Sequence, residues 1–240
     1  MNTEPMTDGY LSVFGASIMQ PIVTLWEELS QRKVATPTEV QTNMFENGLS
    51  ISIIVLTMSM VESYLNRARH IMTLRESHTP PENREPILSF FENNFPSVEL
   101  TKKLSELYAI RDVILHNHIW DALIKDDGNG LKFAEPPTLV KSLYGDNKFR
   151  RILDEKTLCS KTLGLNLFPT KIWREDAKKV IQVAYEILYH VQSVDTSYCV
   201  VSWMLVKFMN KNMKFSEFIL RISGEYRDRK LSIAELAPED

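Results

Sequence analysis

Apolar residues recur every three or four positions along most of this sequence, which is the spacing of one face of an α-helix. The clearest run is Leu100, Leu104, Leu107 and Tyr108, and Arg111 is the next residue on the same stripe. Removing a charge from water is costly, so a cation on an apolar stripe is either part of a structural ion pair or part of a site. The spacing therefore predicts a helix with an unusual cation on its buried face.

Prolines and capping residues mark the ends of further helices. Thr36 followed by Pro37 predicts the start of a second helix, because both residue types favour the first turn. Thr79-Pro80-Pro81 ends that helix, whose length implies either a break near Gly48 or a role as the backbone of a bundle. The expected helices span about 10–33, 37–74, 86–94, 97–123, 146–153, 171–192 and, as two further helices, 196–229.

The stretch from about 126 to 170 lacks a helical period and opens with the turn-forming sequence Asp126-Asp127-Gly128-Asn129-Gly130. Residues 131–133 and 138–140 could pair as a small hairpin across Pro136-Pro137, although proline is disfavoured in a paired strand. We therefore predict an all-α fold, an antiparallel helical bundle over residues 1–195 with an irregular or hairpin insertion at about 126–170. Residues 196–240 are expected to form a C-terminal helical extension packed on the same domain.

Length, charge and cysteine content limit the classes of protein. A chain of 240 residues with 44% hydrophobic content can bury a substantial core. Its net charge of −3 argues against a protein that coats nucleic acid indiscriminately, although a local basic cleft is still compatible with it. Cys159 and Cys199 are far apart and lack the spacing of metal ligands, so neither a disulfide framework nor a metal site is expected.

The expected location is the cytoplasm. Glu4 and Asp8 lie near the start, and no basic region precedes an apolar run there, so we expect no signal peptide. The most apolar run, 51–61, is too short to span a bilayer and includes serine and threonine. We expect it to be the buried middle of a helix in a protein without a membrane partner.

The six residues Arg111-Asp112-Val113-Ile114-Leu115-His116 resemble the Arg-Asn-x-x-x-His signature of HEPN domains, with Asp112 in place of the commoner asparagine. HEPN domains are compact all-helical modules, and many are metal-independent ribonucleases. In that family the signature lies on the third long helical segment after a very long second helix, as we expect here. The resemblance covers about residues 10–195 and implies a HEPN-like bundle and a homodimer with a composite active site.

The two residue types of this signature suit the cleavage of RNA without a metal or other cofactor. A histidine titrates near neutrality and can remove or supply a proton. An arginine stays charged and presents a planar fork to phosphate oxygens. We assign His116 as general base or acid and Arg111 as the clamp for the phosphate. The resemblance implies products with a 2′,3′-cyclic phosphate and a 5′-hydroxyl.

Several neighbours of these two residues have two readings each. Asp112 lies one turn before His116, where it could orient the imidazole or form an ordinary local pair. His118 is the alternative base. Asn117 could contact phosphate or face solvent, and Tyr108 could stack on a base or belong to the core.

A polar residue on the preceding helix could support the signature. Glu62 lies there on a seam with Asn66 and Arg69, and the alternative for all three is a solvated face with ordinary charge pairs. The sequence contains no phosphate-binding glycine loop, no serine-hydrolase elbow and no zinc-protease histidine pair.

These observations predict a HEPN-type endoribonuclease that cleaves RNA, possibly tRNA, as a toxin or antiviral defence effector. A partner protein, such as an antitoxin, would keep it inactive; this step and the choice of RNA follow from the resemblance alone. The first rival is a non-catalytic HEPN-like module that binds RNA or a nucleotide. The second is a helical scaffold subunit of a defence or toxin–antitoxin complex in which the signature residues are structural.

Overall fold

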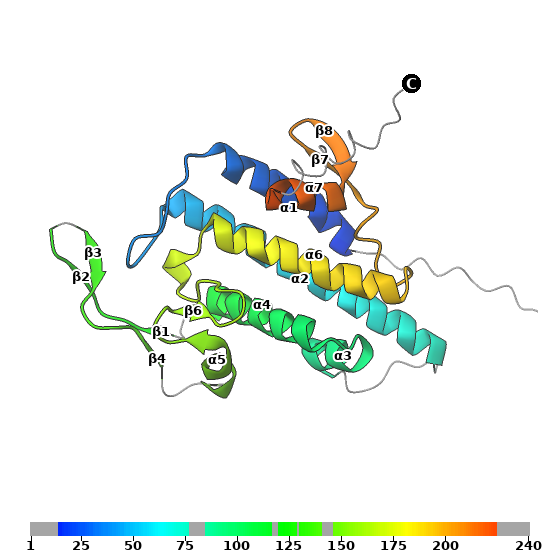
Figure 1. Ribbon diagram of the computed structural model, residues 1–240, viewed down its shortest axis with the longest axis horizontal. Helices are drawn as coiled ribbons and strands as arrows, with labels where there is room; N and C mark the ends of the chain where they lie inside the picture. Colours follow the sequence, from blue (N-terminus) through cyan, green and yellow to red (C-terminus); the bar gives the residue numbers. More distant parts are fainter. Residues whose placement is uncertain (1–13, 77–84, 117–119, 129, 141–145, 225–240) are drawn as a thin grey trace, which may run out of the picture.

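The computed structural model describes residues 14–76, 85–116, 120–128, 130–140 and 146–224. Four long helices dominate these residues: α1 (Phe14–Gln31), α2 (Met44–Glu76), α4 (Val98–His116) and α6 (Arg174–Val194). They lie side by side, with the short α3 (Ile87–Asn94) next to the start of α4 (Figure 1). The predicted mostly helical fold is confirmed.

The helix directions are mixed within this bundle. α1 and α4 run opposite to α2 and α6, so the contacts α1–α2, α2–α4 and α4–α6 are antiparallel (Figure 1). α2 and α6 are in contact and run in the same direction. The antiparallel arrangement expected from the sequence therefore holds for three of these four helix pairs.

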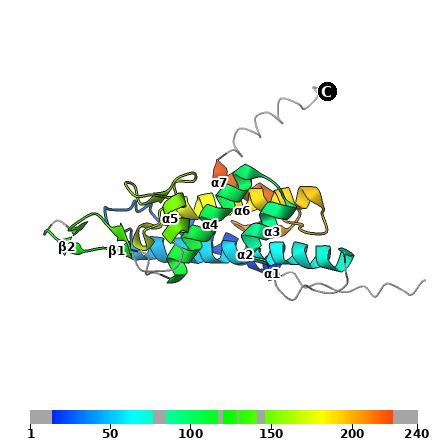
Figure 2. The ribbon, with the colours of Figure 1, turned by 90° about the horizontal axis from the view of Figure 1, so that it is seen from below.

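α2 runs along the length of the body (Figure 2). It packs against α1, α3, α4 and α6, which explains why its apolar residues are not confined to one face. Its fully buried residues include Ile53, Ile54, Met58, Val61 and Leu65, so the apolar run at 51–61 is the buried middle of a helix, as predicted. By length and composition alone α2 could also cross a membrane, with half of the apolar stretch buried inside the protein.

The start of α2 was predicted wrongly. Residues 33–43 are not helical, and the helix begins at Met44 because Asn43 is the cap. The side-chain oxygen of Asn43 accepts hydrogen bonds from the backbone N–H groups of Phe45 at 2.9 Å and Glu46 at 3.4 Å. The helix then continues to Glu76 without a break near Gly48, so of the two alternatives for its length the role as the backbone of the bundle holds.

The end of α4 also differs from the prediction. The helix stops at His116 and not near Leu123. Beyond residues 117–119, which lie outside the described residues, the chain forms β1 (Trp120–Asp121), β2 (Ile124–Asp126), β3 (Leu131–Phe133) and β4 (Thr138–Leu139). The helix is therefore shorter than its apolar period suggested, and its last residue is the signature histidine.

The pairing of these four short strands corrects the predicted hairpin. β2 pairs with β3 across the turn that contains Gly128 and Gly130, and β1 pairs with β4. Both glycines have positive φ, which is readily accessible only to glycine. The chain therefore reverses at the glycines and not at Pro136-Pro137, and 131–133 does not pair with 138–140.

The rest of the insertion is fixed to the bundle by two buried carboxylates. It comprises α5 (Asp146–Ile152), β5 (Leu153–Asp154) and β6 (Cys159–Ser160), and α5 agrees with the helix predicted at 146–153. Glu106 of α4 accepts hydrogen bonds from the backbone N–H groups of Thr162 and Leu163, both at 2.8 Å. Asp176 of α6 accepts two from Asn166, both at 2.9 Å.

A buried ion pair joins the first turns of α2 and α6. Arg174 donates from Nε at 2.7 Å and from Nη2 at 2.6 Å to the carboxylate of Glu46, and these side chains are 10% and 2% exposed. α6 begins at Arg174 and not at 171 as predicted, because Pro169–Lys171 forms a 3-10 turn (η1). The backbone N–H of Trp173 at the cap donates to Asp176.

The C-terminal part contains one of the two predicted helices. Residues 196–204 are not helical, β7 (Leu205–Phe208) and β8 (Lys211–Lys214) form a hairpin, and α7 (Phe215–Ser223) follows. The alternation of exposed and buried residues along β7 is that of a strand. The buried residues of the hairpin and of α7 belong to the same hydrophobic core as the long helices.

Candidate functional site

The site predicted from the signature lies where α4 packs against α2. Arg111 of α4 donates from Nη1 to Glu62 of α2. It also donates from Nη2 and Nε to Oδ1 of the adjacent Asp112, at 2.8 and 3.1 Å. The guanidinium carbon lies 4.7 Å from the centre of the Tyr108 ring, in a cation–π contact. Four of the seven predicted site residues therefore form one cluster, which we call the Arg111 cluster.

The Arg111 cluster is half-buried. The side chains of Arg111, Glu62 and Asp112 are 25%, 35% and 18% exposed. Burial opposes the charge of the guanidinium, but hydrogen bonding and the negative charges of Asp112 and Glu62 outweigh it and raise the pKa of Arg111. The position is therefore less buried than the apolar stripe predicted: it lies at the edge of the core, where water reaches the charged groups.

The guanidinium keeps part of its hydrogen-bonding capacity. Of its five N–H donors, the carboxylates of Glu62 and Asp112 take three. Within the part of the chain that the structure describes, one hydrogen on each terminal nitrogen has no protein acceptor. N–H groups on both terminal nitrogens allow an arginine to bind two oxygens of a phosphate.

Tyr108 occupies the second of its two predicted positions. Its side chain belongs to the hydrophobic core, and the guanidinium of Arg111 lies over the face of its ring. Burial raises the pKa of its phenol, and the negative charge of Glu62 adds to this effect. Tyr108 is therefore neutral at physiological pH and acts as an apolar platform for Arg111.

His116 is the last residue of α4 and is exposed. It follows Arg111 by five positions, which corresponds to about 7.5 Å along the axis of a helix. A side chain at the end of a helix is accessible from several directions. At 3.6 residues per turn the two side chains also leave the helix about 140° apart around its axis. The other two candidates of the signature region, Asn117 and His118, lie outside the described residues.

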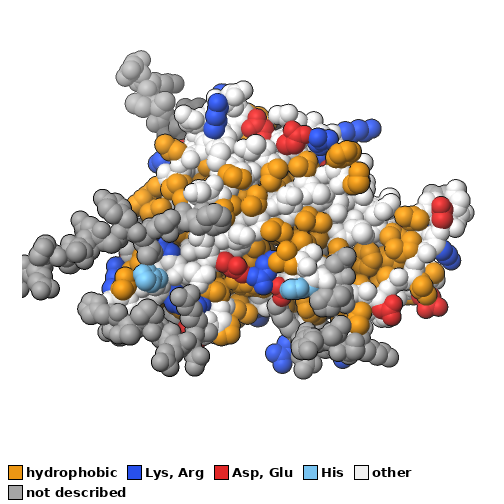
Figure 3. Space-filling model, turned by 180° about the vertical axis from the view of Figure 1, so that it is seen from behind, with side chains coloured by type: hydrophobic (Ala, Val, Ile, Leu, Met, Phe, Trp, Pro, Cys, Tyr) orange, Lys and Arg blue, Asp and Glu red, His pale blue; other side chains and the backbone are white. Residues whose placement is uncertain are grey.

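Figure 3 shows the distribution of charged and apolar side chains on the face of the molecule opposite to that in Figure 1. Acidic, basic and histidine side chains lie close together near the middle of this face, and apolar side chains border them. Leu115, which precedes the signature histidine, is 57% exposed. The end of α4 therefore exposes an apolar side chain, Leu115, beside the imidazole of His116.

Two features of the site were not predicted from the sequence. The first is the stacking of Arg111 on Tyr108, which the spacing of three residues on one helix face could have indicated. The second is a separate aromatic pocket between α6 and α7, whose lining residues include Tyr189 and Trp203. Residues 196–204 were predicted to be helical and are not, and the side chain of Trp203 in this segment is 58% exposed.

Comparisons with protein-family models, with curated proteins and with solved structures find no match to this chain. The chemistry of the described residues therefore carries the functional argument.

Proposed function

We propose that this protein is a metal-independent endoribonuclease of HEPN type whose site is built on Arg111 and His116. The observation that supports this proposal most is the position of the Arg111 guanidinium. Glu62, Asp112 and Tyr108 hold it in place at the edge of the core, on the helix that ends in the exposed imidazole of His116.

The proposed reaction needs one base, one acid and a cation. The imidazole of His116 takes the proton of a ribose 2′-hydroxyl, and the 2′-oxygen attacks the adjacent phosphorus. The bond from phosphorus to the 5′-oxygen breaks, an acid protonates that oxygen, and the products are a 2′,3′-cyclic phosphate and a 5′-hydroxyl. Arg111 binds the phosphate oxygens and stabilises the charge that develops on them.

The reaction also needs an acid that protonates the leaving 5′-oxygen. A single imidazole that has just accepted the proton can return it to the leaving oxygen only if it reaches both atoms, so two groups serve the reaction better. We propose a homodimer in which each copy supplies one His116 to a composite site, with His118 of the same chain as the alternative acid. A mixed dimer of an Arg111→Ala chain and a His116→Ala chain then keeps one guanidinium and one imidazole, so it lacks either the base or the acid and should regain little activity.

Glu62 and Asp112 act as positioning residues in this scheme. Their two negative charges and the single charge of Arg111 leave the cluster with a net charge of −1 when all three are ionised. This net charge weakens the attraction for RNA, so the carboxylates serve geometry and not affinity. Glu62→Gln should therefore lower kcat, because Arg111 loses an anchor, while it leaves KM unchanged or lowers it.

The test is induced expression in a bacterial host, followed by analysis of total RNA and of the fragment ends. The wild type should arrest growth and produce fragments with a 5′-hydroxyl and a cyclic phosphate, and Arg111→Ala and His116→Ala should do neither. His70→Ala and Arg150→Ala are matched controls, because they remove the same side chains elsewhere on the surface. Cleavage that persists in both site variants would refute the assignment.

The rival function is a non-catalytic HEPN-like module or scaffold subunit, and one observation favours it. Two carboxylates already neutralise Arg111, as expected for a structural ion-pair cluster. In that case Arg111→Ala lowers the stability of the fold, and the purified wild type shows no cleavage to begin with. The expression experiment also tests the proposed toxin or defence role and the proposed inhibitory partner protein. Both require that the protein has a nuclease activity that a partner could inhibit.

A further inference from the structure

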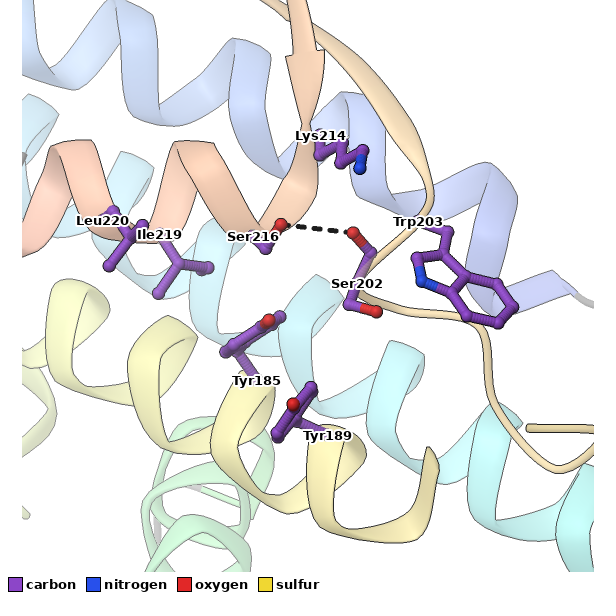
Figure 4. Close-up of a pocket in the computed structure, with 8 residues that line it drawn as sticks. All are labelled: Tyr185, Tyr189, Ser202, Trp203, Lys214, Ser216, Ile219 and Leu220. Atoms are coloured by element: carbon purple, nitrogen blue, oxygen red, sulfur yellow. Dashed lines mark hydrogen bonds between the residues drawn. The ribbon is translucent and has the colours of Figure 1, made fainter. Parts of the chain in front are cut away.

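A second candidate binding site lies on α6 and α7, apart from the Arg111 cluster. It is a cavity of about 480 Å³, within the range of small-ligand sites. Its walls come from α6, from the segment at 202–203, from the end of β8 and from α7 (Figure 4). None of the described residues that line it belongs to α2 or α4.

Aromatic rings dominate the walls of this pocket. Tyr185 and Tyr189 of α6 are stacked, with ring centres 5.9 Å apart and an angle of 22° between their planes. Trp203 lies across the pocket from them (Figure 4). Tyr189 and Trp203 are 52% and 58% exposed. Large aromatic side chains with this exposure provide flat apolar surfaces on which a planar ring can stack.

The charge of the pocket is positive. Among the described lining residues, Lys214 carries the only charged side chain, and it is exposed. Lys207, also exposed, lies diagonally across the hairpin from Lys214, because Leu205 pairs with Lys214 and Lys207 pairs with Asn212. This face of the hairpin therefore carries two cations, of which Lys214 lines the pocket, although the whole chain has a net charge of −3.

The polar framework of the pocket is fixed. Gln192 of α6 binds both the backbone N–H and the hydroxyl of Ser202, at 3.0 and 2.6 Å. Ser216 of α7 donates to the backbone oxygen of Ser202 at 3.2 Å. These bonds hold the backbone at Ser202, next to Trp203, against both helices, so less of the chain has to be ordered when a ligand binds.

We propose that this pocket binds one base of a single-stranded RNA, stacked on the exposed ring of Trp203, with Tyr189 on the opposite wall and an adjacent phosphate on Lys214. Stacked aromatic rings beside lysines are the surface with which proteins hold single strands. This inference rests on the proposed function in one respect, namely that RNA is the substrate. The pocket would then act as a second contact that holds the strand while its cleavage occurs at the Arg111 cluster.

The test measures binding without cleavage, using the full-length protein and a short 2′-O-methyl oligonucleotide that lacks the attacking hydroxyl. Trp203→Ala and Lys214→Gln should each weaken binding in fluorescence anisotropy about tenfold. Lys214→Gln should also reduce the salt dependence by about one phosphate contact. Trp203→Phe should restore most of the affinity because it keeps a ring, and Lys211→Gln, on the same strand outside the pocket, should have little effect.

Two results would overturn the inference. One is that Trp203→Ala and Lys214→Gln bind as tightly as the wild type and Lys211→Gln, with all proteins folded by circular dichroism. The other is that a free mononucleotide binds and the oligonucleotide does not, which would assign the pocket to a nucleotide effector. Because the probe cannot be cleaved, its binding is independent of catalysis at Arg111 and His116. A failure of the nuclease assignment and a failure of this inference are therefore distinguishable.

Discussion

The pair between Glu62 and Arg111 makes a quantitative prediction, because it connects α2 to α4 through side chains that are only half-buried. The perturbation is a double-mutant cycle with Glu62→Gln, Arg111→Met and the combined variant. Methionine keeps the length and apolar stem of the arginine, so the packing on Tyr108 changes little. The cycle isolates the energy of the pair from the other effects of each substitution.

The expected magnitude follows from the exposure of the two side chains, 25% for Arg111 and 35% for Glu62. Fully exposed ion pairs contribute about 0.2–1 kcal/mol, and breaking a buried pair costs about 3–5 kcal/mol. We expect a coupling free energy of about 1 kcal/mol. Arg111→Met alone also loses the hydrogen bonds to Asp112 and should cost about 2 kcal/mol, which lowers Tm by about 4–8 °C for a chain of this length.

The assay is urea unfolding followed by circular dichroism at neutral pH, in low and high salt. The control cycle uses Arg32 and Glu28, an ion pair on α1 with side chains 43% and 50% exposed, for which we expect a coupling below about 0.5 kcal/mol. A coupling between Glu62 and Arg111 that is no larger than this control would contradict the view that Glu62 anchors the guanidinium.

Three further predictions concern other parts of the fold. Glu46→Ala should destabilise the protein by about 3–5 kcal/mol in urea unfolding, because it leaves Arg174 buried without its carboxylate; a loss below 1 kcal/mol would argue against a buried pair. Glu106→Ala should speed hydrogen exchange at the two loop amides that it binds and cost about 2 kcal/mol, whereas unchanged exchange would show that the loop is held otherwise. Burial raises the pKa of Cys199 to about 12, so in native protein at pH 8 a thiol reagent should modify Cys159 and spare Cys199, and equal rates would contradict that burial.

Much of the helical body could be predicted because its signal is local. The apolar period of α4, the short α3 and α5 and the long α6 were expected near their observed positions. Helix ends were less predictable, since the ends depend on single side chains. Asn43 and not Thr36 caps α2, and α4 ends at His116 although apolar residues continue beyond it.

The C-terminal hairpin was missed because its residues suit two structures. The sequence from Val200 to Phe208 is rich in apolar residues, and a short apolar run is compatible with either a helix or a strand. Met209 and Asn210 both have positive φ, a conformation that residues other than glycine seldom adopt and that matches a two-residue hairpin turn. Neither residue is glycine, so the usual sequence sign of such a turn was absent.

The candidate site was predictable in its residues but not in its contacts. The signature indicated Arg111 and Asp112, and the seam on the preceding helix indicated Glu62. The structure adds that all three interact and that Tyr108 supports the cation. Contacts between helices depend on how the side chains of one helix pack into the grooves of the other, which the apolar period of a single helix does not give.

The most direct measurement of the central claim is cleavage of a defined RNA by the purified protein in the presence of EDTA, with the fragment ends identified by mass spectrometry. If Arg111 and His116 form the site, the fragments end in a 2′,3′-cyclic phosphate, and the rate is at least a hundredfold lower for Arg111→Ala and for His116→Ala. An RNA with a single 2′-deoxy nucleotide before the cut is not cleaved. Cleavage that needs a divalent metal, leaves a 5′-phosphate or proceeds at the wild-type rate in both variants would contradict it.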